Sequence, residues 1–213
     1  MIKRALLTAS LLLFGLSGVA QEASTTYVAG TDYDLISPPV RTLSPDQIEV
    51  AEFFWYGCIH CYDFEVLLQP WKKTLSDDVS FRPIPAVWAE QMSLHAKAYY
   101  TAQALGVLDT MHPVIFQAMN VDGKKLSSQA EIAALFTANG VSDEDFNKAF
   151  NSFGVNSQVS QAIATAKAAK LSGTPALMVN GKYYVNQQKA GSQANMLKVV
   201  DFLVEKERAA AAN

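Results

Sequence analysis

The chain has 213 residues, half of them apolar, so it is long enough to bury one sizeable core. Its formal net charge is −3 at pH 7, from 17 lysines and arginines against 20 acidic residues, and no block of basic residues occurs. Nucleic acid and anionic membrane surfaces are therefore not expected as partners.

The first twenty residues have the pattern of a secretory signal peptide. Lys3 and Arg4 give a positive start, residues 6–16 form a short apolar run, and residues 18–20 have the small-x-small pattern before a cleavage point. The apolar run is shorter than the roughly 20 residues that a membrane-spanning helix needs. We therefore expect residues 1–20 to be removed and the mature chain to start at Gln21.

The first strong elements surround Gly57. Residues 48–55 form an apolar run that predicts a buried strand. A helical pattern starts at Cys61, with apolar residues at steps of three and four: Phe64, Leu67, Leu68 and Trp71. Residues 79–87 alternate and contain two prolines, which predicts a second strand that ends early.

Residues 88–171 are predicted to be almost wholly helical. Helices are expected over residues 92–105 and 113–119, after the capping residues Ser128 and Ser142, and over 157–171. In the last of these, Val159, Ile163 and Ala166 are spaced to face a core.

The pattern then returns to strands. Residues 176–179 and 183–185, joined by Asn180-Gly181, have the signature of a hairpin, and a last helix is expected over 195–208. This order predicts an α/β fold in which a sheet-and-helix domain is split by a helical insertion. We expect its first part at 21–87, the insertion at 88–165 and its second part at 166–213.

The chain has only two cysteines, Cys58 and Cys61, placed where the first strand gives way to a helix. A bridge between them would close a very small loop and stabilise little, which favours a chemical role. Backbone N–H groups and the helix dipole would lower the pKa of Cys58, while Cys61, one turn further in, suits the resolving role. His60 lies between them, and stabilising the thiolate would make the disulfide a stronger oxidant.

Other uses of these cysteines fit less well. A zinc site would need two further ligands, and covalent haem would need a histidine where Tyr62 stands. We expect no metal and no cofactor, and structural roles for the isolated His95 and His112.

Two carboxylates lie close to the cysteines in sequence. Glu52 is expected either beneath the thiols, where a raised pKa would let it move the proton of Cys61, or facing water on an edge strand. Glu65 is expected to be solvated.

The dipeptide Thr174-Pro175 precedes the hairpin. A trans proline would be awkward there, although cis bonds are rare even before proline. If the bond is cis and close to Cys58, the backbone of Thr174 can pair with an extended substrate chain.

Two segments together resemble the DsbA family of periplasmic thiol:disulfide interchange proteins: residues 52–65 (EFFWYGCIHCYDFE) and residues 173–183 (GTPALMVNGKY). The resemblance implies a thioredoxin-like fold with an inserted helical domain. It implies that Cys58 is the nucleophile and Cys61 the resolving cysteine. It also places Glu52 at the buried acid and Pro175, after Thr174, at a cis-proline.

The resemblance also has consequences for partners. It implies unfolded, newly exported proteins as substrates, reoxidation by a quinone-linked membrane partner of the DsbB type, and a periplasmic location. No additional dimerisation domain is visible, so a monomer is expected.

The chain departs from the family's pattern at two places. Ile59 stands where the family usually has proline, which affects the oxidising strength and makes Ile59, with Thr174 and Pro175, a candidate for substrate contact. The lysine that often faces the buried acid has no clear equivalent; Arg82 and Pro83 lie near that place.

Three functions follow from these patterns. The first is an oxidase that donates the Cys58–Cys61 disulfide to exported proteins. The second is a disulfide isomerase or reductase of the same fold, and the third is a chaperone-like binder of unfolded exported chains.

Overall fold

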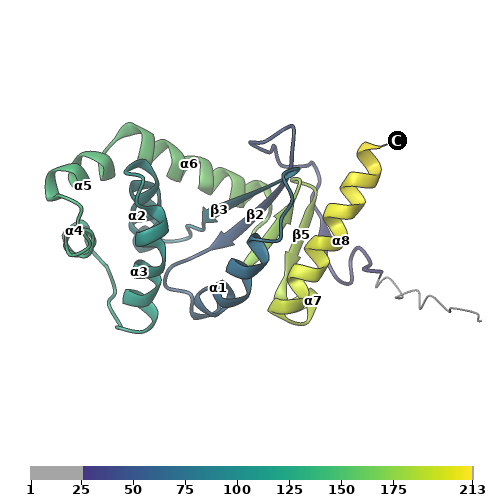
Figure 1. The fold of residues 1–213 in the computed structure, drawn as a ribbon, viewed down its shortest axis with the longest axis horizontal. Helices are drawn as coiled ribbons and strands as arrows, with labels where there is room; N and C mark the ends of the chain where they lie inside the picture. The colour runs from purple at the N-terminus through teal and green to yellow at the C-terminus, as the bar shows by residue number, and fades with distance from the viewer. Residues whose placement is uncertain (1–25, 213) are drawn as a thin grey trace, which may run out of the picture.

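The computed structural model describes residues 26–212, so the expected signal peptide and the expected start at Gln21 lie outside the described residues. One five-stranded sheet has the order β1-β5-β4-β2-β3 (Figure 1). The strands are β1 Asp34–Leu35, β2 Ile48–Phe54, β3 Val79–Pro85, β4 Ala176–Val179 and β5 Tyr183–Asn186. Within this sheet of the described chain, β2 and β3 pair in parallel and the other neighbouring strands pair antiparallel.

The position of each strand follows from its sequence. β2 lies between β4 and β3 and is almost wholly buried, as its apolar run predicts. β3 is an edge strand, and this explains Pro83 and Pro85, because a proline has no N–H to offer to a second neighbouring strand. β3 ends at Pro85, inside the alternating run 79–87, so the early end predicted for this strand is confirmed.

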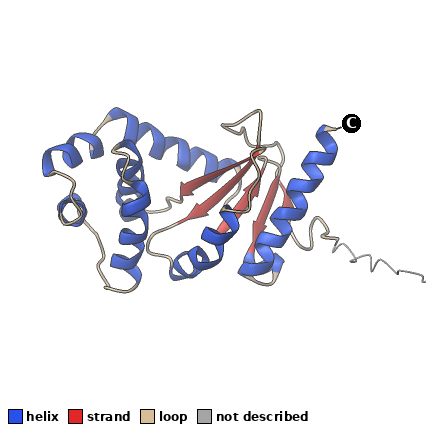
Figure 2. Ribbon diagram, viewed as in Figure 1, coloured by secondary structure: helices blue, strands red, loops and turns tan. Residues whose placement is uncertain are grey.

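Helices cover both faces of the sheet, which confirms the α/β class (Figure 2). Helix α1, Ile59–Lys72, and helix α8, Gln193–Ala211, pack on one face, where Phe64 and Leu68 meet Val50 and Leu203. The short helix α7, Gln187–Ala190, precedes α8. Leu67 does not join this core as its spacing predicts; it is 38% exposed.

The insertion consists of helices gathered beyond the β3 edge of the sheet (Figure 1). They are α2 Glu90–Ala104, α3 Leu108–Asn120, α4 Gln129–Thr137, α5 Asp143–Phe150 and α6 Phe153–Ala168. Helix α6 contacts both α2 and β3, so it joins the insertion to the sheet as one continuous helix. The boundary expected at residue 165 therefore falls inside α6.

The buried stripe of α6 differs from the prediction at one residue. Val155, Val159, Ala162 and Ala166 are buried, whereas Ile163 is 41% exposed. The helix begins at Phe153 rather than at 157. Counted from Val155 in steps of four, three and four residues, the positions that face the core are 155, 159, 162 and 166, so Ala162 is buried. Ile163 lies one residue further around the helix, on the solvent side.

Local capping and turn predictions are confirmed. Ser128 Oγ accepts from the N–H of Glu131, and Ser142 Oγ accepts from the N–H of Asp145. In the β4–β5 turn Gly181 has φ +66°, and a Cβ there would lie 1.9 Å from the carbonyl oxygen of Val40. Only glycine allows that close approach. No helix among residues 26–212 is long and apolar enough to cross a bilayer.

Candidate active site

The two cysteines lie where β2 gives way to α1. Cys58 is the N-cap of α1, and its Sγ accepts a hydrogen bond from the N–H of Cys61 at 3.3 Å. The N–H of Cys58 in turn donates to the carbonyl of Trp55 at 3.0 Å, which fixes the loop. Cys58 is half-buried, Cys61 is fully buried, and both are free thiols. An external thiol can therefore approach Cys58 but not Cys61.

The same geometry makes the two thiols chemically unequal. Hydrogen bonds from the Cys61 thiol, from Thr174 and from the N–H groups of Cys61 and His60 lower the pKa of Cys58 to about 6, against the effect of its partial burial. Burial, followed by the neighbouring Cys58, raises the pKa of Cys61 far above its ordinary value. Cys58 is thus a thiolate near neutral pH, while Cys61 keeps its proton.

The second motif meets the first at Cys58. The Thr174–Pro175 peptide bond is cis, and the Cys58 thiol donates to the carbonyl oxygen of Thr174 at 3.5 Å. A small hollow of about 190 Å³ beside them is lined by Thr174, Pro175, His60 and Tyr184. The strand that Pro175 introduces, β4, lies next to β2, so the sheet holds both motifs in place.

His60 and Ile59 are both exposed at the start of α1. The backbone N–H of His60 stabilises the Cys58 thiolate, and the backbone carbonyl of His60 accepts from Gln193 Nε2 at 2.6 Å. The contribution of His60 to the stability of the Cys58 thiolate therefore comes from its backbone N–H. Ile59 is 49% exposed and places an apolar side chain next to Cys58.

Glu52 lies buried in β2, 1% exposed, beneath α1. Its Oε1 has no hydrogen-bond partner among residues 26–212. Burial raises its pKa well above the ordinary value, and the charge of Glu65 adds to this shift. The water-facing alternative for Glu52 is therefore wrong.

Arg82 does not balance the charge of Glu52. Arg82 lies opposite Ala51 in the β2–β3 register, so its side chain is on the face of Glu49 and not on that of Glu52. It forms a two-pronged ion pair with the buried Glu49, at 2.7 and 3.0 Å. Pro83, which lies opposite Glu52, brings no charge.

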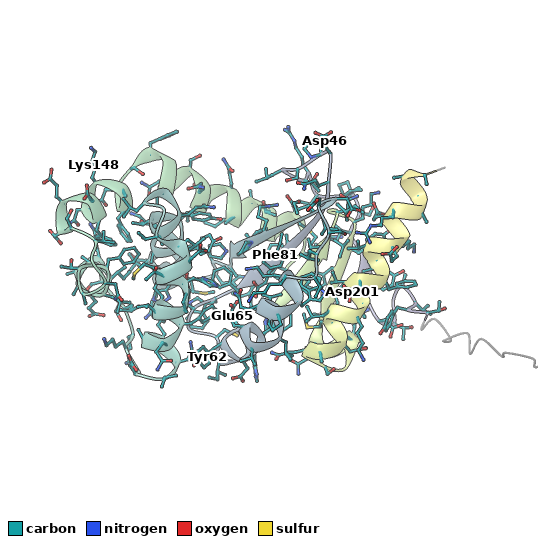
Figure 3. The ribbon with its side chains drawn as sticks, in the orientation of Figure 1. Asp46, Tyr62, Glu65, Phe81, Lys148 and Asp201 are labelled. Carbon is teal, nitrogen blue, oxygen red and sulfur yellow. The ribbon has the colours of Figure 1, made fainter. Side chains whose placement is uncertain are left out.

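Glu65 is less exposed than expected. Its side chain is 17% exposed, and its Oε1 lies 3.6 Å from Nε2 of His112 on α3. Burial alone would raise the pKa of Glu65, but His112, Gln69 and Lys72 together hold it below the ordinary value. The reason is tertiary: α3 contacts α1, and His112 of α3 meets Glu65, which is labelled beside α1 in Figure 3.

Glu52 and Glu65 line a common cavity. It has a volume of about 750 Å³, and most of its wall is apolar. Its lining comes from α1, β2, β3, α2 and α3. Sequence reasoning missed this cavity, although the seven-residue spacing from Cys58 to Glu65 places both on one side of α1.

The two remaining histidines have different surroundings. His95 is buried, accepts from Trp55 Nε1 at 2.9 Å, and faces the carbonyl oxygens of Lys125 and Leu126 at 3.2 Å. These contacts fix the loop before Cys58, in keeping with the structural role expected of His95. His112 faces the cavity instead.

Comparison with known proteins agrees with this geometry. Residues 49–198 match the family model described as a DSBA-like thioredoxin domain. The chain is 39% identical to Thiol:disulfide interchange protein DsbA of Pseudomonas aeruginosa, over 99% of both chains. It is 40% identical to the protein of the same name from Azotobacter vinelandii, over 93% of both chains.

A solved structure extends the match to three dimensions. The crystal structure of Pseudomonas aeruginosa DsbA superposes with a TM-score of 0.84 at 39% identity, covering 88% of this chain and 97% of that one. The fold is thus thioredoxin-like, and the matched region includes both cysteines, Thr174 and Pro175. The chain belongs to the DsbA family and is a thiol–disulfide oxidoreductase.

Proposed function

We propose that this protein is an oxidase that donates its Cys58–Cys61 disulfide to reduced, newly exported proteins. The observation that carries the proposal is the inequality of the two thiols: Cys58 is half-buried with a pKa of about 6, and Cys61 is buried with a strongly raised pKa. A thiolate that is stable at neutral pH favours the reduced form of the pair, so the disulfide is readily given away.

Donation takes two exchanges. A substrate thiolate attacks Cys58 Sγ, the Cys58–Cys61 bond breaks, and Cys61 takes the electron pair and a proton. A second substrate thiolate then attacks the substrate sulfur of the mixed disulfide, and Cys58 leaves as a thiolate. The low pKa of Cys58 makes it a good leaving group in this second step.

Each remaining candidate residue has a place in this scheme. Thr174 and Pro175 border Cys58, where the Thr174 backbone can pair with an extended substrate, and the exposed Ile59 offers an apolar contact. His60 stabilises the thiolate through its N–H. Glu52 exchanges the proton of Cys61, which is consistent with its burial beneath α1 and its raised pKa.

After each donation the reduced Cys58–Cys61 pair has to be oxidised again by a partner protein. We assign reoxidation of the Cys58–Cys61 pair to a quinone-linked membrane protein of the DsbB type, and the location to the periplasm, on the strength of the family and of the signal-like residues 1–20. The proposed arrangement is a monomer whose sheet-and-helix domain, 21–87 and 166–213, carries the insertion 88–165.

The test is the equilibrium potential of the pair against a series of glutathione buffers. A potential well above that of glutathione is expected. A value near that of thioredoxin, about −270 mV, would overturn the oxidase and leave a reductase. Replacing both cysteines by serine separates the chaperone-like alternative, because a chaperone would bind unfolded chains as well as before.

A further inference from the structure

The proton of Cys61 has no direct route to water. Cys61 is fully buried, and Glu52, which we propose as its proton partner, is 1% exposed. Each round of oxidation and reoxidation nevertheless moves one proton onto Cys61 and off again. The proton therefore has to leave through the space that Glu52 faces, where another titratable group can pass it to solvent. Glu52 lines the cavity of about 750 Å³, so the candidates for this role are the other residues that line the same cavity.

Three side chains that can carry a proton line this cavity: Glu52, Glu65 and His112. Glu52 Oε1 is unpartnered among the described residues, and the charge of Glu65 raises the pKa of Glu52. His112 follows, with Nε2 3.6 Å from Glu65 Oε1. The side chains of Glu65 and His112 are 17% and 12% exposed, so water reaches both.

The surroundings of His112 allow its ring to be neutral or charged without rearrangement. Phe54, Tyr99 and Phe116 pack edge-to-face around the ring, with centroids 5.0–5.9 Å away, and hold its plane. Nδ1 lies 2.8 Å from the hydroxyl of Tyr56. That hydroxyl donates to a neutral Nδ1 and accepts from a protonated one, so the contact persists in both states.

The ring of His112 shares its surroundings with other titratable or charged residues. The titratable and charged residues that line the same cavity or touch the ring are Glu52, Tyr56, Tyr62, Glu65, Lys72, Tyr99 and Asp109. Burial raises the pKa of Tyr56 and Tyr99, which keeps both hydroxyls neutral at ordinary pH. Imidazole is the side chain in this set with two ring nitrogens, so it can accept a proton at one and release a proton from the other.

We propose that His112, supplied by the helical insertion, is a positioning residue that exchanges protons with solvent and, through Glu65 and Glu52, sets the protonation of Cys61. This inference rests on the proposed function and extends it. The insertion then contributes to the chemistry of the thiol pair as well as covering the sheet edge.

The reaction that isolates this step is oxidation of the reduced protein by oxidised glutathione. Cys58 attacks, the glutathione disulfide breaks, one glutathione leaves as a thiolate, and a Cys58–glutathione disulfide forms. Cys61 then attacks Cys58 Sγ, the second glutathione leaves as a thiolate, and the proton of Cys61 passes to Glu52 and outward. Acid quenching and mass spectrometry measure the two steps separately.

The variant is His112→Gln, whose amide can still accept from Tyr56. We expect formation of the Cys58–glutathione disulfide at the wild-type rate, and its resolution by Cys61 at least about tenfold slower between pH 5 and 8. The matched control is Gln117→Ala, which removes a polar side chain of α3 that lines the same cavity and carries no group that exchanges protons near neutral pH. Its resolution step should keep the wild-type pH profile.

A second variant guards against a purely structural effect. In His112→Ala, free imidazole should enter the cavity and restore resolution, whereas pyrazole, of similar shape but far weaker base strength, should not. Wild-type resolution in His112→Gln, an equal loss in Gln117→Ala, or equal rescue by pyrazole would each overturn the role of His112. Failure of the wild-type protein to form the glutathione adduct would instead count against the proposed function itself.

Discussion

The sulfur of Cys58 lies 3.5 Å from the carbonyl oxygen of Thr174, although 116 residues separate them in the chain. The two residues meet because β4, which follows Pro175, pairs with β2, which precedes Cys58. Thr174 also lowers the pKa of Cys58. One residue thus borders the proposed substrate site and tunes the nucleophile.

Replacing Thr174 by valine should raise the pKa of Cys58 and make the disulfide less oxidising. The physical reason is the loss of a hydrogen-bonding group that favours the thiolate. Thiolate absorbance against pH and the glutathione equilibrium measure the two effects. Thr174→Ser, which keeps the hydroxyl, is the control and should stay close to the wild type; an unchanged Cys58 pKa in the valine variant would contradict the argument.

The stability of the reduced protein should depend on pH through Cys58. Its pKa is about 6 when folded, against 9.0 for an ordinary thiol. A depressed pKa adds stability that is fully present above the unfolded value and is lost as pH falls to the folded one. Relative to the oxidised form, the reduced form should therefore gain unfolding free energy as pH rises from about 6 to about 9. Urea unfolding of both forms across this range measures it, and parallel curves would refute it.

The sequence was sufficient to predict the features that depend on local patterns. The pair Cys58 and Cys61 at a helix start, the proline-bearing edge strand and the Asn180-Gly181 hairpin each follow from neighbouring residues. For Glu52 the sequence left two environments open, the interior beneath the thiols and water at an edge strand. A short apolar run does not reveal which face of a strand is covered.

Features that depend on docking could not be predicted in this way. Glu65 is covered because α3 packs on α1, and its partner His112 lies 47 residues further along the chain. Arg82 pairs with Glu49 because of the β2–β3 register, which no local pattern gives. These contacts are set by tertiary arrangement.

Replacing Ile59 by proline should leave the protein folded. Ile59 is the first residue of α1, where a proline fits and its missing N–H is not needed within the helix. The N–H groups that stabilise the Cys58 thiolate belong to His60 and Cys61, so they remain in place. We expect the free energy of unfolding to stay within about 1 kcal/mol of the wild type, measured by urea denaturation. A larger loss would mean that the backbone at Ile59 is more constrained than its position at the helix start indicates.

Replacing Glu52 by glutamine should stabilise the protein at neutral pH while slowing the resolution step of Cys61. A carboxyl whose pKa is raised by burial destabilises the fold as pH rises above its unfolded value, since ionisation then has to occur without solvent. The wild type should lose unfolding free energy above about pH 4.5, its reference value, and the variant should lose less. Denaturation at a series of pH values measures the change in stability. Acid-quenched oxidation by glutathione measures the rate of the Cys61 resolution step. Equal pH slopes in both proteins would show that Glu52 is not the group responsible.

Replacing Arg82 by methionine should destabilise the fold without changing the potential of the thiol pair. The variant leaves the Glu49 carboxylate buried, 1% exposed, with its ion pair broken, at a cost of roughly 3 kcal/mol. Glu49 then keeps only the N–H of Leu43 as a partner among the side-chain contacts of the described chain. The double variant with Glu49→Gln removes that charge as well and should recover much of the loss. Because Arg82 lies on the face of β3 opposite to Glu52, both variants should equilibrate with glutathione like the wild type. A shifted potential in the single variant that the double variant does not reverse would show that Arg82 acts on the thiols across the sheet.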